Sequence, residues 1–542
     1  MRKIIALCCL MGILLLSACT PTETPTNTTT SSTTAGTTTS TEDTTTSTED
    51  TTTSTEDTTT TTTTVPSEGT DDETPSDDVD ATLDYKEIIP TGNTAQLLNP
   101  QKGGADKEAE TLRQEILNTE DTLTITGTKY YISSNGNDDN DGTSPATAWK
   151  TTDALLMNNY LLEPGDAVLF ERGGIYRRNS PIIAMEGVTY GAYGEGDKPA
   201  IYGSSTNYAW GTQWQPSRKE NIWKVTIFGD DAGIVVFNHG EAVGTKKLHG
   251  INELSENGDY YHNSDTSILY MYCDKGYPNV IYKDIEIGTK ENIFTIPPKT
   301  ANVTIDNLAM KYAGCFGVDV QEYSEGFSMT NCELGWIGGS RFYNSDAQLG
   351  NAIQFWENTT DALVENNWIY QVYDAGITPQ GTDAKEASVY KNLVLRKNLV
   401  EFCSYSIEWF DRNSASLWDG FVIEDNILRF AGYGWAGARP DTPAVGHFVG
   451  WTFLNDDLPG MSVKNNIFDC TANNMVYWNS SSGWKNHANV KISGNSFYQK
   501  ANLTGNVLKY ADKGQLKATN QAEFEVAMRM FDPDAKVIKW VS

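Results

Sequence analysis

A set of asparagine-ended segments recurs through the second half of the chain and constrains its fold more than any other feature. In each segment apolar residues lie two apart, polar residues follow, and an asparagine comes before a mainly apolar stretch. The closing residues are Asn367, Asn398, Asn426, Asn466 and Asn495, which are 31, 28, 40 and 29 residues apart. VTIDN, ending at Asn307, and FSMTN, ending at Asn331, look like earlier and slightly offset members.

Self-similarity with a period of about 20 to 50 residues is typical of stacked repeats. Short strands with a period of two, and no helical period between them, predict an all-β fold, a right-handed parallel β-helix. Asparagine suits the turns because it tolerates left-handed backbone, and its amide can bond to the asparagine of the next coil. A β-sandwich with asparagine turns is the alternative, and the near-regular spacing over five coils argues against it.

The first 19 residues carry a targeting pattern. Two basic residues precede an apolar run, as in a secretory signal. The run ends in Leu-Ser-Ala-Cys, which resembles a bacterial lipobox. This resemblance implies that Cys19 is lipidated and holds the chain on the extracellular face of a cell membrane. A transmembrane anchor is the alternative, but the apolar run is short for one.

Residues 20–104 form a Thr/Ser/Asp/Glu-rich linker. Between Thr20 and Asp80 there are 14 acidic residues and no Lys or Arg. Almost no apolar residues are available to bury, so we expect this segment to be disordered. It contributes much of the formal net charge of −31, which therefore reflects a solvated stalk rather than the substrate. An acidic chain without a basic stripe also argues against nucleic-acid binding.

Residues 105–542 can form one β-helix domain, because solenoids grow without enlarging their core. The apolar spacing of Ala105–Thr119 predicts a helix that packs on the first coil as an N-terminal cap. Pro145–Tyr160 is predicted to be a second helix, and Gln521–Met530 a short closing helix. The stretch from about 208 to 287 is rich in Trp and Tyr and departs from the coil pattern, so we expect a β-rich insertion there. We expect a monomer.

The sequence gives little indication of a metal. Asn137, Asp139, Asp141 and Gly142 have the spacing of the first half of an EF-hand loop, but the twelfth position is Ala148 rather than Glu. A turn is therefore the default interpretation, with calcium as the alternative, and no other cofactor is expected. The cysteines after Cys19 are predicted to be buried thiols, and none has the spacing of a zinc site. They are Cys273, Cys315, Cys332, Cys403 and Cys470.

Four apolar pairs align between successive coils, and a polar residue follows each of them. The pairs are Gly317-Val318, Ala352-Ile353, Gly376-Ile377 and Ser406-Ile407, and the following residues are Asp319, Gln354, Thr378 and Glu408. If the aliphatic residue points inward, this row points outward. Coils lie ~4.8 Å apart, so such rows would line a long groove suited to a polymer.

Glycoside hydrolysis needs two carboxyl groups, no more than ~9.5 Å apart. Asp319 and Glu408 are three coils apart, which places them ~14 Å apart and too far. Glu357 and Asp411 are two coils apart, ~10 Å, at or beyond the limit. Asp374 and Glu408 lie on neighbouring coils among apolar residues that could raise one pKa. We therefore predict Asp374 and Glu408 as the catalytic pair; the alternative is that either carboxylate caps a turn.

Further residues near this row are predicted to bind the substrate. They are Gln354, Trp356, Glu357, Trp409, Asp411, Trp435, Arg439 and His447. An indole suits the C–H face of a sugar, and Trp451 is one more candidate for such stacking. Alternatives remain open: each Trp could be buried, Arg439 could be a structural bridge, and His447 could be a satisfied core residue.

Five blocks carry a resemblance to a known group. QFWEN, YDAGIT, YSIEWF, AGYGWAGARPD and GHFVGW resemble recurring blocks of secreted bacterial β-helix proteins near glycoside hydrolase family 141. The resemblance covers roughly Glu108 to Trp540. It implies xylanase or α-L-fucosidase activity and the retention of Asp374 and Glu408, and it does not fix the substrate.

Three functions follow from these patterns. The first is a cell-surface glycoside hydrolase acting on plant polysaccharide such as xylan. The second is a lyase acting on a uronate polymer, which needs a Lys or Arg base and often calcium. The third is a non-catalytic glycan-binding surface protein. The predicted groove is richer in Trp and carboxylates than in Lys, which favours the first function because an acidic groove repels polyuronate.

Overall fold

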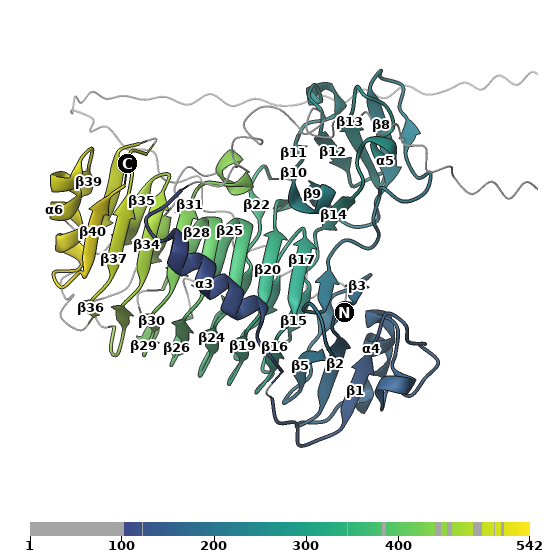
Figure 1. Cartoon of the computed structure of the whole chain (residues 1–542), viewed down its shortest axis with the longest axis horizontal. Coiled ribbons are helices and arrows are strands. Elements are labelled where there is room, and N and C mark those ends of the chain that lie inside the picture. Colours follow the sequence, from purple (N-terminus) through teal and green to yellow (C-terminus); the bar gives the residue numbers. More distant parts are fainter. Residues whose placement is uncertain are drawn as a thin grey trace, which may run out of the picture. The chain divides into compact units, whose positions relative to one another are not determined.

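The computed structural model describes residues 102–121, 123–343, 345–381, 386–413, 415–439, 446–452, 458–480, 490–502, 504–510 and 514–541. The predicted signal sequence, the lipidated Cys19 and most of the linker fall on residues 1–101, outside the described residues. The described part is a right-handed parallel β-helix, as predicted (Figure 1).

Three sheets form the sides of the coils. Sheet 1 consists of β1 (Lys129–Ile132), β2 (Ala167–Glu171), β5 (Thr189–Tyr193), β16 (Thr304–Asp306), β19 (Ser328–Thr330), β24 (Leu363–Glu365), β27 (Val394–Arg396), β30 (Val422–Glu424), β33 (Ser462–Lys464) and β36 (Lys491–Ser493). Sheet 2 consists of β3 (Ile175–Arg177), β6 (Ala200–Tyr202), β17 (Ala309–Ala313), β20 (Glu333–Ile337), the first halves of β25 (Trp368–Gly381) and β28 (Leu399–Asp411), β31 (Ile427–Ala431), β34 (Ile467–Thr471), β37 (Ser496–Gln499) and β40 (Val537–Trp540). Sheet 3 consists of β4 (Ile182–Ile183), β15 (Phe294–Ile296), β18 (Val318–Val320), β23 (Ile353–Trp356), the second halves of β25 and β28, β32 (Gly446–Thr452), β35 (Asn474–Ser480), β38 (Asn506–Tyr510) and the antiparallel β39 (Gln515–Lys517).

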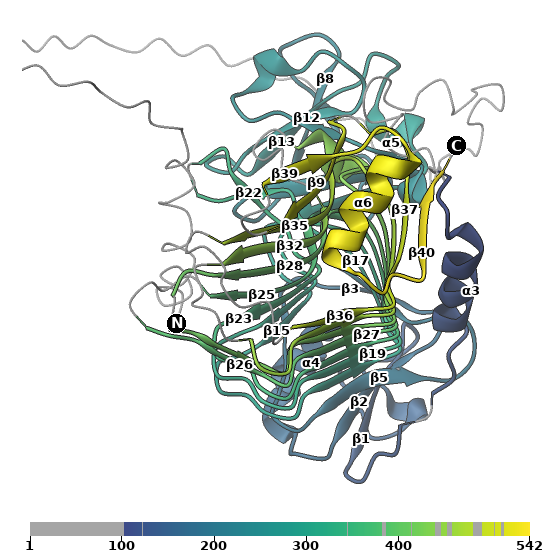
Figure 2. The same cartoon turned by 90° about the vertical axis from the view of Figure 1, so that its left-hand side faces the viewer.

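From β2 to β38 the chain passes from sheet 1 to sheet 2 to sheet 3 in each coil. Figure 2 looks along the helix axis from the C-terminal end, where each coil turns counter-clockwise as it advances toward the viewer. Successive side chains of a strand point to opposite faces, so alternate residues fill the interior. Ile353, Ile377 and Ile407 stack in register in this way and are fully buried.

The predicted asparagine ladder lies at the corner between sheets 1 and 2. The Nδ2 of each ladder asparagine donates to the Oδ1 of the next, at 2.9 to 3.1 Å, from Asn367 through to Asn495. All five ladder asparagines are fully buried. The ladder ends at Asp532, whose carboxylate accepts from Asn495 at 2.8 Å.

One part of the ladder prediction is wrong. The left-handed backbone belongs to the residue before each ladder asparagine, and these residues are Asn366, Lys397, Asp425, Asn465 and Gly494. The ladder asparagines therefore contribute hydrogen bonds rather than backbone conformation. In the earlier coils Asn307 (φ 61) and Asn331 (φ 55) occupy the left-handed position, which explains their offset in the sequence.

Helix α3 (Asp106–Leu117) lies along sheet 2 and not on the first coil, which corrects the expectation of a cap at the N-terminal end (Figure 1). Its buried Ala109 and Ile116 pack on Leu399 of β28 and Ile427 of β31. The helix had to cover an apolar surface, and sheet 2 presents one in these middle coils.

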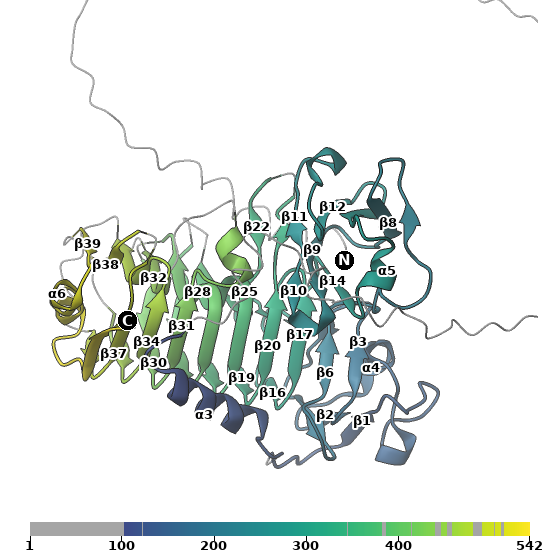
Figure 3. The same cartoon turned by 45° about the horizontal axis from the view of Figure 1, so that its top comes forward.

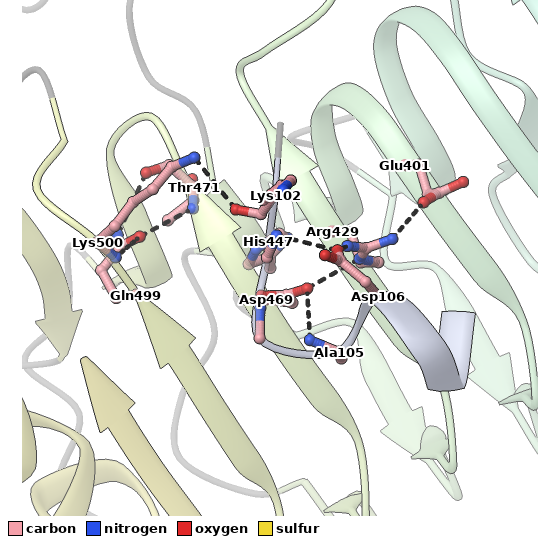
Figure 4. A network of polar contacts seen from close by, with 12 residues as sticks. Lys102, Ala105, Asp106, Glu401, Arg429, His447, Asp469, Thr471, Gln499 and Lys500 are labelled. Carbon is pink, nitrogen blue, oxygen red and sulfur yellow. Dashed lines mark hydrogen bonds and ion pairs between the residues drawn. The ribbon is translucent and has the colours of Figure 1, made fainter. Parts of the chain in front are cut away.

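A buried charge network fixes the start of α3 (Figure 4). Arg429 donates to Asp469 at 2.9 Å and to Glu401 at 3.1 Å, and it also pairs with Asp106 of the helix. The backbone amide of Ala105 donates to Asp469 at 3.1 Å. Buried charges are tolerated only when they are paired in this way.

The residues between β6 and β15 form two small sheets beside the N-terminal coils (Figure 3). The inner sheet contains β9 (Ala232–Phe237), β10 (Ala242–Val243) and β14 (Ile285–Thr289), and the outer sheet contains β7 (Gln215–Pro216), β8 (Ile222–Thr226), β11 (Thr245–Lys246), β12 (Asp259–Asn263) and β13 (Ile268–Tyr272). Ile234 and Val236 of β9 pack in one cluster with Tyr312 and Trp336 of the β-helix. A short helix, α5 (Pro278–Ile281), precedes β14.

The ends of the solenoid are covered by local structure. The predicted closing helix is α6 (Gln521–Phe531), and its Phe524 and Met528 complete the core. The predicted second helix is shorter than expected: α4 spans Thr152–Asn158, with one turn of 3₁₀ helix at Pro145–Thr147. The helix is interrupted between these two segments, where the Lys150 and Thr151 amides donate to the Asp138 side chain rather than to backbone carbonyl groups.

The Asn/Asp-rich loop before α4 is the predicted turn. Asp141 Oδ1 accepts hydrogen bonds from the Thr143 amide at 2.9 Å and the Thr147 hydroxyl at 2.7 Å. Within the described ranges, no cluster of three His, Cys, Asp or Glu residues could hold a metal ion. None of the helices in those ranges is both long enough and apolar enough to cross a bilayer.

Candidate active site

The predicted outward row is present on sheet 3. Thr295, Asp319, Gln354, Thr378 and Glu408 occupy equivalent positions on β15, β18, β23, β25 and β28. The apolar residue before each of them points into the core. Polar side chains therefore line up across five strands as far as Glu408, and the next position, on β32, is the apolar Val449.

Glu408 is a buried carboxyl group with a strongly perturbed proton affinity. Its Oε2 accepts hydrogen bonds from the Thr378 hydroxyl at 3.2 Å and from Gln380 Nε2 at 3.0 Å. Burial and, second, the charge of nearby Asp374 raise the pKa of Glu408 to about 8. The group can therefore hold a proton at neutral pH.

Asp374 lies beside Glu408 because β25 is irregular where it turns from sheet 2 to sheet 3. The register with β28 shifts between Val372 and Ala375. Such a bulge re-aims a side chain away from its ladder position. The Asp374 Oδ1 accepts a hydrogen bond from Arg439 Nη1 at 2.6 Å. This ion pair favours the carboxylate form of Asp374.

Arg439 is held over two aromatic rings. Its guanidinium lies 4.8 Å from the Tyr373 ring centroid and 5.9 Å from that of Tyr405. The Arg439 side chain is 5% exposed, whereas Asp374 is 21% exposed. The carboxylate is thus the more accessible partner, and the arginine supports it from the protein side.

The insertion packs against the residues next to Asp374 and Arg439. Tyr373 and Trp435 pack together, with ring centroids 5.1 Å apart, in the same cluster as Ile234 and Val236 of β9. Gly338 leaves room for Tyr373, because a Cβ on this glycine would lie 2.7 Å from the Tyr373 Cβ. The side chains next to Asp374 and Arg439 are therefore held by packing from two parts of the molecule.

Trp435 itself is not available as a sugar-stacking platform, which corrects that prediction. Its indole is 7% exposed, and its Nε1 donates to the Gln371 carbonyl at 2.8 Å. It lies in the segment Trp435–Ala438 and secures the position of Arg439, which follows directly.

Trp409 is also placed differently from the prediction. It is fully buried in the core, with the Trp478 ring 5.0 Å and the Trp418 ring 5.2 Å away. Strand alternation requires this, because Glu408 points outward and its neighbour must point inward. Gly450 on β32 makes the space, since a Cβ there would lie 2.5 Å from the Trp409 Nε1.

His447 is a core residue rather than a substrate ligand. It is fully buried, and its Nδ1 lies 3.0 Å from the Ser406 hydroxyl. Burial lowers the pKa of His447 to about 3, so it is neutral. Figure 4 shows His447 near Arg429 and Asp469 of the network that docks α3.

Asp411 serves the corner between sheets 3 and 1. It is 1% exposed, and its Oδ1 accepts from the Asn413 amide at 2.7 Å and the Ser416 hydroxyl at 3.1 Å. Burial raises the pKa of Asp411 to about 7. This placement corrects the substrate-binding prediction, because the carboxyl group binds its own loop.

The other predicted binding residues lie at the outward row or its edge. Gln354 donates to Asp319 at 3.1 Å and accepts from Asn351 at 2.9 Å. Trp356 is partly exposed and stands in register with Gln380 and Phe410.

Two more positions complete the edge of this row. Glu357, also partly exposed, directly follows Trp356 and has a left-handed backbone (φ 50). The Trp451 backbone stands opposite Phe410, and its side chain lies outside the described set.

Sequence reasoning missed two residues that shape the site. Gln380 donates to Glu408, and Tyr405 faces Arg439 together with Tyr373, which was expected only as an aromatic neighbour of the carboxyl groups. Gln380 could have been found, because it lies two residues after Thr378 and the period of two places it outward. No sequence pattern signalled that the tyrosines would meet Arg439, since this contact depends on the bulge and on the packing of the insertion.

Comparison with known proteins gives a short local match and distant structural likenesses. No family model matches the chain. A stretch of 110 residues is 34% identical to a lacto-N-biosidase of Bifidobacterium longum, and it spans 19% of this chain and 7% of that relative.

Solved structures with a similar course of the chain include carbohydrate-active proteins. A complex of XylC with xylose shares 14% identity and 68% coverage of both chains, with a TM-score of 0.39. A GH136 lacto-N-biosidase from Eubacterium ramulus shares 13% identity, covering 76% of this chain and 68% of its own, with a TM-score of 0.36. Pectate lyase Pel9A shares 12% identity over 72% and 73% of the chains, also with a TM-score of 0.36. Values this low do not transfer an activity or a family to this chain.

Proposed function

We propose that the protein is a glycoside hydrolase whose catalytic pair is Glu408 and Asp374. The observation that carries the proposal is the contrast between two adjacent carboxyl groups. Glu408 is buried with a pKa raised to about 8, and Asp374 is ion-paired with Arg439. When the surroundings of two carboxyl groups make their pKa values differ in this way, one group can act as the acid and the other as the base or nucleophile.

The chemistry follows from these protonation states. Protonated Glu408 donates its proton to the glycosidic oxygen as the bond to the leaving sugar breaks. Asp374, as a carboxylate, either attacks the anomeric carbon or removes a proton from the attacking water. Thr378 and Gln380 keep the Glu408 carboxyl group oriented through its Oε2. Arg439 stabilises the negative charge on Asp374 before the attack on the anomeric carbon or the removal of the water proton.

The outward surface of sheet 3 supports a glycan as the substrate. Gln380 and Trp356 are partly exposed at this surface and offer an amide and an indole to a sugar. We propose a xylan-like plant polysaccharide as the first substrate, following the resemblance to glycoside hydrolase family 141. The local match to a lacto-N-biosidase makes lacto-N-biosides the second. We also propose that Cys19 is lipidated and holds the enzyme at the cell surface.

The test is to incubate the full-length chain with xylan, pectin and lacto-N-biosides, following new reducing ends and the ultraviolet absorbance of unsaturated products. Reducing ends without absorbance, lost in the Glu408→Gln and Asp374→Asn variants, would support the proposal. Activity should also fall above about pH 8, as Glu408 loses its proton. Glu424→Gln is the matched control, because that carboxylate lies on sheet 1, where it pairs with Lys464.

Two results would contradict the proposal. Unsaturated products would indicate a lyase, and unchanged activity in Glu408→Gln would exclude this residue as the acid. Binding of the glycan with no bond cleavage would favour a surface protein that only binds.

A further inference from the structure

The outer part of the insertion exposes two aromatic side chains on neighbouring loops. Trp210 is 61% exposed and precedes β7, and Tyr277 is 44% exposed and is the N-cap residue of α5. The Asn279 Nδ2 donates to the Gly211 carbonyl at 2.8 Å, which ties the two loops together. The rings therefore belong to one surface region.

Each ring is also braced from the protein side. The Arg177 guanidinium lies 5.5 Å from the Trp210 ring centroid, and both of its terminal nitrogens bond to Glu286, at 2.7 and 2.5 Å. Glu286 is 1% exposed, so the arginine has little freedom to leave the ring.

Tyr277 has an equivalent support. Its ring centroid lies 4.0 Å from that of Trp223, whose Nε1 donates to the Cys273 carbonyl at 2.9 Å. Exposed aromatic rings that are fixed in this way lose little conformational entropy when they bind a ligand.

We propose that Trp210 and Tyr277 form a second, non-catalytic binding site for the pyranose units of a neutral polysaccharide. The C–H face of a pyranose ring is apolar and complements the face of an aromatic ring. Two rings on tied loops can engage units of the same chain, which suits a repeating polymer better than a free sugar. Neither ring carries a charge, which suits a neutral polymer.

The position of the site suggests what it does. Trp210 and Tyr277 lie on the loops before β7 and α5, outside the inner sheet that braces Tyr373 and Trp435 (Figure 3). A polymer bound there would stay near the enzyme while the Asp374–Glu408 site acts on it. Bivalent contact of this kind raises the local substrate concentration.

The experiment measures binding of the full-length chain to xylan, cellulose and mannan by affinity electrophoresis and by pull-down on insoluble polymer. All variants carry Glu408→Gln as well, so that the polymer is not consumed. The Trp210→Ala and Tyr277→Ala double variant should lose roughly tenfold or more in affinity. Phe228→Ala is the matched control, because Phe228 is 82% exposed on the same insertion and lies outside the two loops.

Several outcomes would overturn the proposal. These are no binding to any of the polymers, equal binding by the double variant, or an equal loss in the Phe228→Ala control. Binding of the aromatic patch to anionic phospholipid vesicles in place of polysaccharide would also overturn it. Melting temperatures must agree among the variants, as expected for exposed residues.

This test is independent of hydrolysis. If the double variant loses polymer binding but the chain with Glu408 intact never cleaves the polymer, the proposed function fails and the second site stands. If the chain with Glu408 intact cleaves short oligosaccharides but the double variant binds the polymer as well as its parent, the second site fails and the proposed function stands.

Discussion

Replacement of Asn426 by alanine should be among the most destabilising single changes in the β-helix. Its side-chain Nδ2 donates to the Leu395 carbonyl and to Asn466 Oδ1, both at 2.9 Å. Its Oδ1 accepts from the Asn398 amide at 3.0 Å and from the Asn398 Nδ2 at 2.9 Å. Four hydrogen bonds inside the corner disappear together in the variant.

The size of the stability loss depends on which hydrogen-bonding partners of Asn426 are left without another partner. The Asn398 Nδ2 still donates to Val364, and the Asn466 Oδ1 still accepts from the Asn426 amide. The Asn398 amide loses its acceptor, whereas the Leu395 carbonyl loses its side-chain partner and keeps its place in the β27–β30 ladder. A buried, unsatisfied group costs ~1–3 kcal/mol and the deleted side chain leaves a cavity, so we expect a loss of about 3 kcal/mol.

Urea unfolding followed by circular dichroism measures this loss. Asn257→Ala is the matched control, because Asn257 makes two hydrogen bonds of 2.9 Å with Asp274 at an exposed position. The control should cost less than about 1 kcal/mol. If Asn426→Ala loses no more stability than the control, the asparagine ladder does not hold the coils together and the reasoning is refuted.

Two other predictions concern buried charge. Arg429→Met should cost ~3–5 kcal/mol, because buried Asp469 loses its cation and Glu401 keeps only Arg113; Arg396→Met, whose arginine is 46% exposed, should cost under ~1 kcal/mol by the same urea titration. Equal losses would contradict the assigned role of the network. Wild-type stability should fall as the pH rises from about 4.5 to about 8, because folded Glu408 keeps its proton over that range and the unfolded chain releases it. Thermal melts across this range should show the free energy of unfolding of Glu408→Gln rising relative to that of the wild type by a few kcal/mol, on the order of 1.4 kcal/mol per pH unit. If the two proteins have the same pH dependence, the raised pKa of Glu408 is refuted.

The sequence was sufficient for the architecture because each coil carries its own local signature. Apolar alternation and the ladder asparagines mark the corners between sheets 1 and 2 from Asn367 to Asn495, and the aligned pairs predicted the register of sheet 3. The location of α3 was not predictable in the same way. The spacing of Ala109 and Ile116 identifies the buried face of the helix, but any coil with an apolar outer surface would satisfy it.

The site shows the same division. Glu408 follows from the ladder register, and strand alternation, applied one residue further, would have placed Trp409 in the core. Asp374 and Arg439 meet at a bulge, and Trp435 is covered by the insertion. These two features depend on contacts between segments far apart in the chain, which no period in the sequence encodes.

The docking of α3 changes how the solenoid behaves as a chain of coupled units. In most repeat proteins each repeat contacts only its neighbours, so unfolding can start at either end and spread. Here Arg113 of α3 bonds to Glu401, which is 288 residues away, and Gly104 bonds to Asp469, which is 365 residues away. The helix can dock only after the strands from β25 to β34 exist, so it is a late step in folding. Once in place it links several coils at once, and the central repeats must open together rather than one at a time.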